Sequence, residues 1–80
     1  MYLEILTPDQ TVFSGEVTSV QVPGTAGRFE VLINHAPIIS TLEKGQVMIR
    51  IAKEEKSFTI DGGVVEVLHD KVIVLAESIL

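Results

Sequence analysis

Apolar and polar residues alternate with a period of two along most of the chain. Phe29, Val31 and Ile33 occupy every second position of one run, and Val47 and Ile49 begin another. Side chains of a β-strand point to opposite faces in turn, so this spacing predicts strands with one buried face. No segment carries apolar residues at the helical spacing i, i+3, i+4, i+7. We therefore predict an all-β chain with no long helix.

Short segments rich in turn-forming residues separate these runs. Thr7–Gln10 suits a type I turn, because Pro8 presets φ at its second position. Glu43–Gly45 and Asp61–Gly63 favour tight turns, because glycine accepts a positive φ. The turns divide the chain into about nine short strands, which indicates a two-sheet β-sandwich or flattened barrel. The expected strand ranges are 2–7, 11–16, 17–23, 28–33, 38–43, 46–53, 56–61, 63–68 and 71–77.

Two late runs are apolar on both faces. Val64–Leu68 is interrupted only by Glu66, and Val72–Leu75 contains no polar residue. Such a strand either lies at the centre of a covered sheet or presents one face to a partner. We favour the central position, because β-sandwiches commonly cover such strands themselves.

Length and composition restrict the classes of protein that fit. Eighty residues hold one small core, so we predict a single domain over residues 1–80. The absence of cysteine excludes disulfides, thiolate zinc sites and cysteine nucleophiles. A formal net charge of −5 disfavours binding to nucleic acid phosphates. The start of the chain has no cationic or long apolar stretch, so we expect no signal peptide, no membrane span and an intracellular location.

No residue pattern predicts a catalytic site, a cofactor site or a metal site. Gly24–Gly27 lacks the Gly-Lys-Ser/Thr continuation of a phosphate-binding loop, and His35 and His69 each lack a second metal ligand at suitable spacing. The bend Asn34–Pro37 is more informative, because proline fixes its own φ and restricts the residue before it. Either His35 only ties down this loop, or the bend is a rigid loop offered to a partner.

A set of short motifs, in order and spacing, resembles one family over essentially the whole chain. These motifs are Leu6-Thr7-Pro8, Val12-Phe13-Ser14-Gly15, Val20-Gln21-Val22-Pro23-Gly24, Asn34-His35-Ala36-Pro37-Ile38, Gly45 ahead of Val47–Ile51, Asp61-Gly62-Gly63-Val64-Val65-Glu66-Val67 and Val72–Ala76. The set resembles the epsilon subunits of rotary proton-driven ATP synthases, which are called delta subunits in mitochondria.

The resemblance implies a non-catalytic β-sandwich of about ten strands in the rotor, coupling proton flow to ATP synthesis. One face would pack against the gamma subunit of the central stalk, and the lower end would rest on polar loops of the c-subunit ring. The implied gamma-facing residues are Thr7, Ser40 and Leu42. The implied residues facing the c ring are Gly27, Arg28, Glu30, Asn34 and His35.

The resemblance also bears on regulation and location. Longer members continue into an inhibitory helical hairpin that in some binds ATP, whereas this chain ends at Leu80. We therefore expect a short form that lacks the hairpin. The resemblance predicts an inhibitory or nucleotide-binding role only for a longer chain that continues into the hairpin. The expected location is peripheral, on the cytoplasmic face of the bacterial inner membrane or on the stromal or matrix face of an organelle. Contact with the membrane would be indirect, through the c ring.

Two other classes fit the chain less well. A lipoyl- or biotinyl-type carrier domain would have a modified Lys53 or Lys56 at a hairpin tip, but the Ala52–Lys56 segment lacks a Met-Lys-Met or Asp-Lys-Ala context. A carbohydrate- or peptide-binding sandwich would need an exposed aromatic platform. The only aromatic residues are Tyr2, Phe13, Phe29 and Phe58.

Overall fold

Strands form all of the regular secondary structure. A computed structural model describes all 80 residues. The strands are β1 (Tyr2–Leu6), β2 (Thr11–Glu16), β3 (Ser19–Val22), β4 (Phe29–Leu32), β5 (Ile38–Ile51), β6 (Glu54–Val67) and β7 (Lys71–Ala76). The all-β prediction is therefore confirmed. The structure contains no helix with the length and hydropathy needed to cross a membrane.

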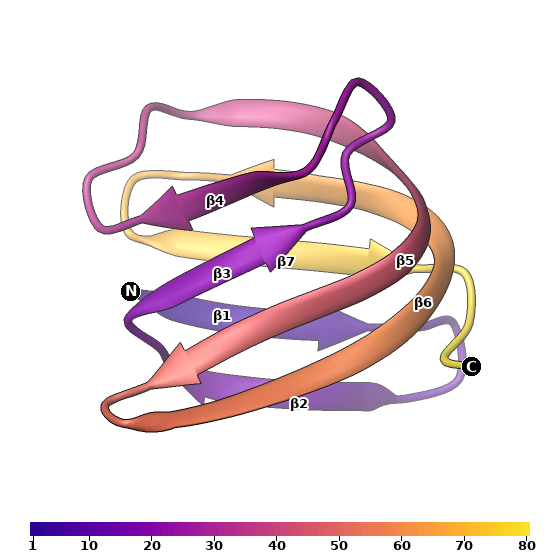
Figure 1. Cartoon of the computed structure of the whole chain (residues 1–80), viewed down its shortest axis with the longest axis horizontal. Helices are drawn as coiled ribbons and strands as arrows, with labels where there is room; N and C mark the ends of the chain where they lie inside the picture. The colour runs from indigo at the N-terminus through magenta and orange to yellow at the C-terminus, as the bar shows by residue number, and fades with distance from the viewer.

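The seven strands form one mixed sheet in the order β2-β1-β7-β6-β5-β3-β4. Only the pairing of β1 with β7 is parallel. The long strands β5 and β6 curve strongly around one side of the molecule (Figure 1). As a result, Ile38–Leu42 of β5 lies in a layer with β7, β1 and β2, whereas the later half of β5 lies with β3 and β4. The sheet thus folds over itself into a two-layer β-sandwich.

The strand count is lower than the predicted nine to ten, because two expected turns lie inside continuous strands. Neither Glu43–Gly45 nor Asp61–Gly63 reverses the chain, and Leu42 of β5 still pairs with Gly63 of β6. The expected strands 38–43 and 46–53 are therefore one strand, β5, and 56–61 and 63–68 are one strand, β6. Each long strand serves both layers, so the two-layer architecture is unaffected by the difference.

The glycines of these two segments permit bending and close approach. Gly62 and Gly63 have φ values of 100° and 152°, which glycine adopts without steric cost. A Cβ atom on Gly63 would collide with the carbonyl oxygen of Leu75. A Cβ atom on Gly45 would lie 2.8 Å from the Cβ atom of Pro23. The glycine signals therefore mark a sharp bend and a close crossing rather than reversals of the chain.

The core lies between the two layers and contains sixteen buried hydrophobic residues. Val65, Val67, Val72 and Val74 are at most 2% exposed, and their strands β6 and β7 are interior strands of the sheet. The favoured central position within the sheet is confirmed, but the sandwich covers only one face of these strands. On the opposite face of β7, Leu75 is 50% exposed, so the outer face of the same strand also carries apolar surface.

Candidate interaction surfaces

The β3–β4 loop, residues 23–28, is fastened to β5 by polar contacts. The backbone N–H of Thr25 donates to the carbonyl of Thr41 at 3.0 Å, and the two threonine hydroxyls are 2.7 Å apart. The Arg28 guanidinium donates to the Gln46 carbonyl at 2.6 Å. The tip residues, Thr25 to Arg28, are exposed. This loop is therefore a polar surface held in one shape by the neighbouring strand.

The bend that follows β4 is a compact turn. The His35 N–H donates to the Leu32 carbonyl at 3.1 Å, and Asn34 has a φ of 67°. Asparagine tolerates this left-handed conformation better than most residues. The imidazole Nδ1 of His35 lies 2.7 Å from the Ala36 carbonyl oxygen, and because a carbonyl only accepts, Nδ1 carries the hydrogen. The contact fixes the ring within its own loop, as one of the two sequence interpretations proposed.

The five residues implied to face the c ring do not form one cluster. Gly27 and Arg28 precede β4, whereas Asn34 and His35 follow it, so the two pairs lie at opposite ends of that strand (Figure 1). A four-residue strand spans about 13 Å at the usual rise. Glu30 lies between the pairs on β4, where its carboxylate accepts a 3.5 Å hydrogen bond from the Gln21 amide.

The residues implied to face gamma differ in their exposure. The Thr7 hydroxyl accepts hydrogen bonds from the backbone N–H groups of Asp9 and Gln10, so it stabilises the predicted turn at residues 7–10. Ser40 is half-buried on β5. Leu42 is 5% exposed and belongs to the core. Leu42 can therefore support a contact surface only from beneath.

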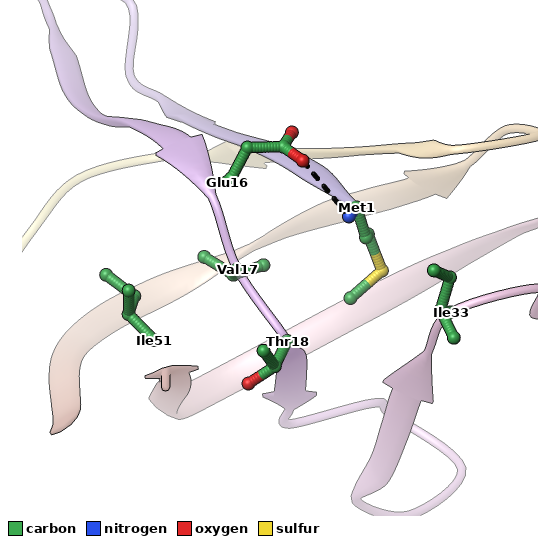
Figure 2. Close-up of a pocket in the computed structure, with 6 residues that line it drawn as sticks. All are labelled: Met1, Glu16, Val17, Thr18, Ile33 and Ile51. Carbon is green, nitrogen blue, oxygen red and sulfur yellow. Dashed lines mark hydrogen bonds and ion pairs between the residues drawn. The ribbon is translucent and has the colours of Figure 1, made fainter. Parts of the chain in front are cut away.

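A pocket that sequence reasoning missed opens at the end of the sandwich that carries Met1 (Figure 2). We call it the N-terminal pocket; it is lined by Met1, Glu16, Val17, Thr18, Ile33 and Ile51 and has a volume of about 380 Å³. Its lining comes from four separate segments of the chain. The one local signal is an apolar Ile33 beside the polar bend, and that signal does not identify a pocket.

Metal-ligating side chains do not gather into a group in the structure. No group of three or more His, Asp or Glu side chains could hold a metal ion. Every buried side-chain nitrogen or oxygen has a hydrogen-bond partner. Lys53 lies at the exposed tip of the β5–β6 hairpin, and Lys56 is exposed on β6.

Comparison with known proteins gives a family match over the whole chain. The model of the family described as "ATP synthase, Delta/Epsilon chain, beta-sandwich domain" matches residues 1–80. The ATP synthase epsilon chain of Chlorobium limicola is 45% identical over 78 residues, which cover 96% of this chain and 89% of that protein. The epsilon chain of Sulfurimonas denitrificans is 50% identical over 79 residues, covering 95% of this chain and 59% of that protein.

Some relatives are longer than this chain. A solved structure also shares its fold. This chain covers 54% of the epsilon chain of Dehalococcoides mccartyi strain CBDB1, to which it is 42% identical over 76 residues and 95% of its own length. A chain of the Euglena gracilis mitochondrial ATP synthase superposes with a TM-score of 0.91 at 18% identity, covering 98% of this chain and 51% of that one. At this identity, the superposition establishes a shared fold.

Proposed function

This chain belongs to the delta/epsilon chain family of ATP synthases, and from that premise we propose that it is a non-catalytic rotor subunit. In this role it links the gamma subunit of the central stalk to the c-subunit ring and couples proton flow to ATP synthesis. The observation that carries the proposal is the family match over residues 1–80, together with epsilon chains 45–50% identical over nearly the whole chain. The same match favours the rotor role over that of a carrier domain modified on Lys53 or Lys56.

The fold suits a part that transmits torque. The strands β5 and β6 pair along almost their whole length, from Ile38 with Val67 to Ile51 with Glu54, and both continue through the two layers. A close-packed core joined by a continuous hydrogen-bonded ladder resists shear between the layers. A linker between the ring and the stalk needs this resistance, because local yielding would dissipate the rotation. One continuous sheet and one core cluster also support our proposal that residues 1–80 act as a single domain.

The c-ring contact is proposed to follow β4, which is an edge strand of the sheet. Gly27 and Arg28 lie at one end of this strand and Asn34 and His35 at the other, with Glu30 between them. A surface that includes all five residues must therefore run along the strand. Since most of these groups are polar and exposed, part of the attachment should weaken as salt rises.

The gamma contact is proposed to include Thr7 and Ser40, with Leu42 supporting the surface from the core. Ile39 is 73% exposed on the face of β5 opposite to that of Ser40, where it supplies apolar surface of the kind that lasting interfaces contain. Through these two contacts the domain would sit peripherally, on the cytoplasmic face of the inner membrane in a bacterium, and reach the membrane only through the c ring.

The test is the triple variant Arg28→Ala, Glu30→Ala and His35→Ala in a reconstituted synthase. The three side chains lie outside the core, so we expect the variant to fold with a wild-type melting temperature. We expect ATP synthesis driven by a proton gradient to fall, and the variant to dissociate from isolated c rings at lower salt than the wild type. Normal assembly and normal coupling of this variant would refute the c-ring role of these residues.

A further inference from the structure

The two layers of the sandwich present outer faces of different chemistry. The first layer contains Ile38–Leu42 of β5, the later half of β6, and the strands β7, β1 and β2. Successive side chains of a strand point to opposite faces, so the residues that alternate with the buried ones point outward. In β7, for example, Val74 is buried, so its neighbours Ile73 and Leu75 lie on the outside.

Five apolar side chains share the outer face of the first layer. Three of them form a row across neighbouring strands, because Leu75 of β7 pairs with Val64 of β6 on one side and with Leu6 of β1 on the other. Ile39 is 73% exposed and Leu75 is 50% exposed. The core cluster and the side chains packed against it include none of the five. We call this set the apolar outer face, and its members are Leu6, Ile39, Val64, Ile73 and Leu75.

The charged side chains of this face lie beside the apolar row and not within it. The Lys71 Nζ lies 2.9 Å from a carboxylate oxygen of Glu4 and 5.9 Å from the centre of the Tyr2 ring. Glu66 is half-buried on β6, two residues from Val64 and on the same face. The row therefore offers uncharged surface that charged groups border on one side.

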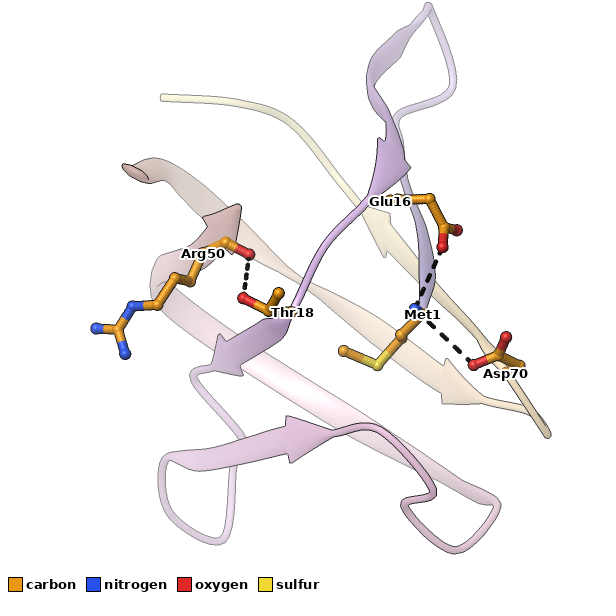
Figure 3. Close-up of polar contacts among 5 residues, drawn as sticks. All are labelled: Met1, Glu16, Thr18, Arg50 and Asp70. Atoms are coloured by element: carbon orange, nitrogen blue, oxygen red, sulfur yellow. Dashed lines mark hydrogen bonds and ion pairs between the residues drawn. The ribbon is translucent and has the colours of Figure 1, made fainter. Parts of the chain in front are cut away.

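The outer face of the second layer, which contains β3, β4, the later half of β5 and the first half of β6, is polar. Arg50 forms a 2.9 Å ion pair with Glu55 on this face. The Arg50 carbonyl accepts a 2.9 Å hydrogen bond from the Thr18 hydroxyl (Figure 3). The apolar side chains of this face are Leu32 and Met48, and the polar ones include Gln21, Glu30, Gln46 and Ser57. Water therefore solvates this face better than the outer face of the first layer.

The residues implied to face gamma lie at both ends of the apolar row. At one end, Thr7 directly follows Leu6. At the other end, Val64 pairs with Thr41, which lies between the two implied residues of β5. The residues implied to face the c ring lie on or beside β4, in the second layer. The apolar row is therefore continuous with the gamma contact proposed above and separate from the c-ring contact.

We propose that the gamma subunit covers the apolar outer face, with Leu75 at the centre of the contact, and leaves the outer face of the second layer uncovered. This inference rests on the rotor role proposed above. Leu42 points toward the core, so gamma reaches β5 through Ile39 and Thr41, on the outward side of that strand. An apolar centre with charged groups at its border is the usual arrangement of a lasting protein interface.

The first test compares two leucines of nearly equal exposure on the two outer faces. Leu75 of β7 is 50% exposed, and Leu32 of β4 is 51% exposed. The binding of Leu75→Asn and Leu32→Asn to purified, immobilised gamma subunit is measured against that of the wild type. We expect at least a tenfold loss of affinity for Leu75→Asn and less than a twofold change for Leu32→Asn. Melting curves of both variants verify that they fold.

The second test uses two isoleucines and does not depend on the stability of the Leu75 variant. Ile39 is 73% exposed and Ile33 is 63% exposed, so replacing either one has little effect on folding. Threonine is β-branched, so Ile39→Thr keeps the strand propensity of its position. The control Ile33→Thr changes the bend after β4, outside the apolar outer face. We expect Ile39→Thr to weaken gamma binding about threefold and Ile33→Thr to weaken it less than twofold.

The outcomes separate this inference from the proposal beneath it. If the wild-type chain binds gamma but Leu75→Asn weakens binding no more than Leu32→Asn, gamma does not cover the apolar outer face. If Ile33→Thr weakens binding more than Ile39→Thr, gamma contacts the bend instead. If the purified chain sediments as a dimer that Leu75→Asn dissociates, while gamma affinity is unchanged, the face joins two copies of this chain. If the wild-type chain fails to bind gamma at all, the rotor role itself is contradicted.

Discussion

The two ends of β4 differ in what they present to other molecules. Before the strand, Thr25 and Arg28 fasten a polar loop to β5 with hydrogen bonds. At its other end, Leu32 is the last residue of the strand and Ile33 follows it; they are 51% and 63% exposed, and Ile33 forms a wall of an apolar pocket. One short strand therefore connects two different surfaces. Water solvates the polar loop well, whereas burial of the apolar surface by a partner is energetically favourable.

This difference suggests that the two ends of β4 contribute to binding in different ways. Polar, exposed groups give orientation and salt-sensitive attachment, whereas buried apolar anchors supply most of the energy of a lasting contact. The polar loop therefore suits the polar loops of the c ring, and the apolar surface beside the bend suits a partner that covers it. Both ends depend on the same strand pairing, so damage to the shared frame should affect them together.

The largest expected effect comes from Gly63→Ala, which damages the bend that serves both layers. The added Cβ atom would collide with the Leu75 carbonyl, and Gly63 has a φ of 152° that alanine adopts poorly. Steric overlap and backbone strain together should lower the free energy of unfolding by about 3–5 kcal/mol. Urea unfolding measures the loss.

The control for this change is Gly15→Ala. Its added Cβ atom would make an ordinary 3.5 Å contact with the Phe13 ring, and the position has no positive φ. Its free energy of unfolding should stay within about 0.5 kcal/mol of the wild-type value. Equal stability of the two variants would show that the bend at Gly63 is not a required feature.

The second-largest expected effect is a loss of stability that compares the backbone conformations at the two ends of β4. Gly27, in the polar loop, has a φ of 131°, whereas Asn34, in the bend, has a φ of 67°. The first value is open mainly to glycine and the second lies in the left-handed region that other residues enter at modest cost. Gly27→Ala should cost about 2 kcal/mol and Asn34→Ala about 1 kcal/mol in unfolding experiments. The reverse order would contradict this comparison.

The smallest expected effect is a gain in stability at the β5–β6 hairpin, which ends next to Ile51 of the N-terminal pocket. Ala52 has a φ of 54° in a two-residue turn, since Ile51 pairs with Glu54. Glycine is the preferred residue for positive φ in such turns. Ala52→Gly should raise the free energy of unfolding by about 0.5 kcal/mol, because relief of strain exceeds the added chain entropy. A lower melting temperature would contradict this expectation.

The strands and the core were predictable because alternation is a local signal of burial. Val47 and Ile49, assigned to one face by their spacing, are both fully buried. The turn at Thr7–Gln10 was also predictable, since its proline and threonine act within four residues. By contrast, a glycine signal has several structural meanings. At Gly45 it allows the approach of Pro23, and at Gly63 it allows a bend, so both were wrongly assigned to turns.

The interaction surfaces were less predictable because they depend on how distant segments meet. Sequence spacing placed Arg28 and His35 seven residues apart but could not show that β4 holds them at opposite ends. The N-terminal pocket needs the pairing of Thr18 with Arg50 and of Val17 with Met1. Those hydrogen bonds follow from the closure of the sandwich, which no local pattern encodes.

Proton-driven ATP synthesis is the most direct measurement of the proposed rotor role. The synthase would be reconstituted into vesicles without this subunit, and the purified 80-residue chain would then be added back. We expect low synthesis without the chain, and recovery in proportion to the amount of chain bound. Full, coupled synthesis in a normally assembled enzyme that lacks the chain would contradict the proposed function.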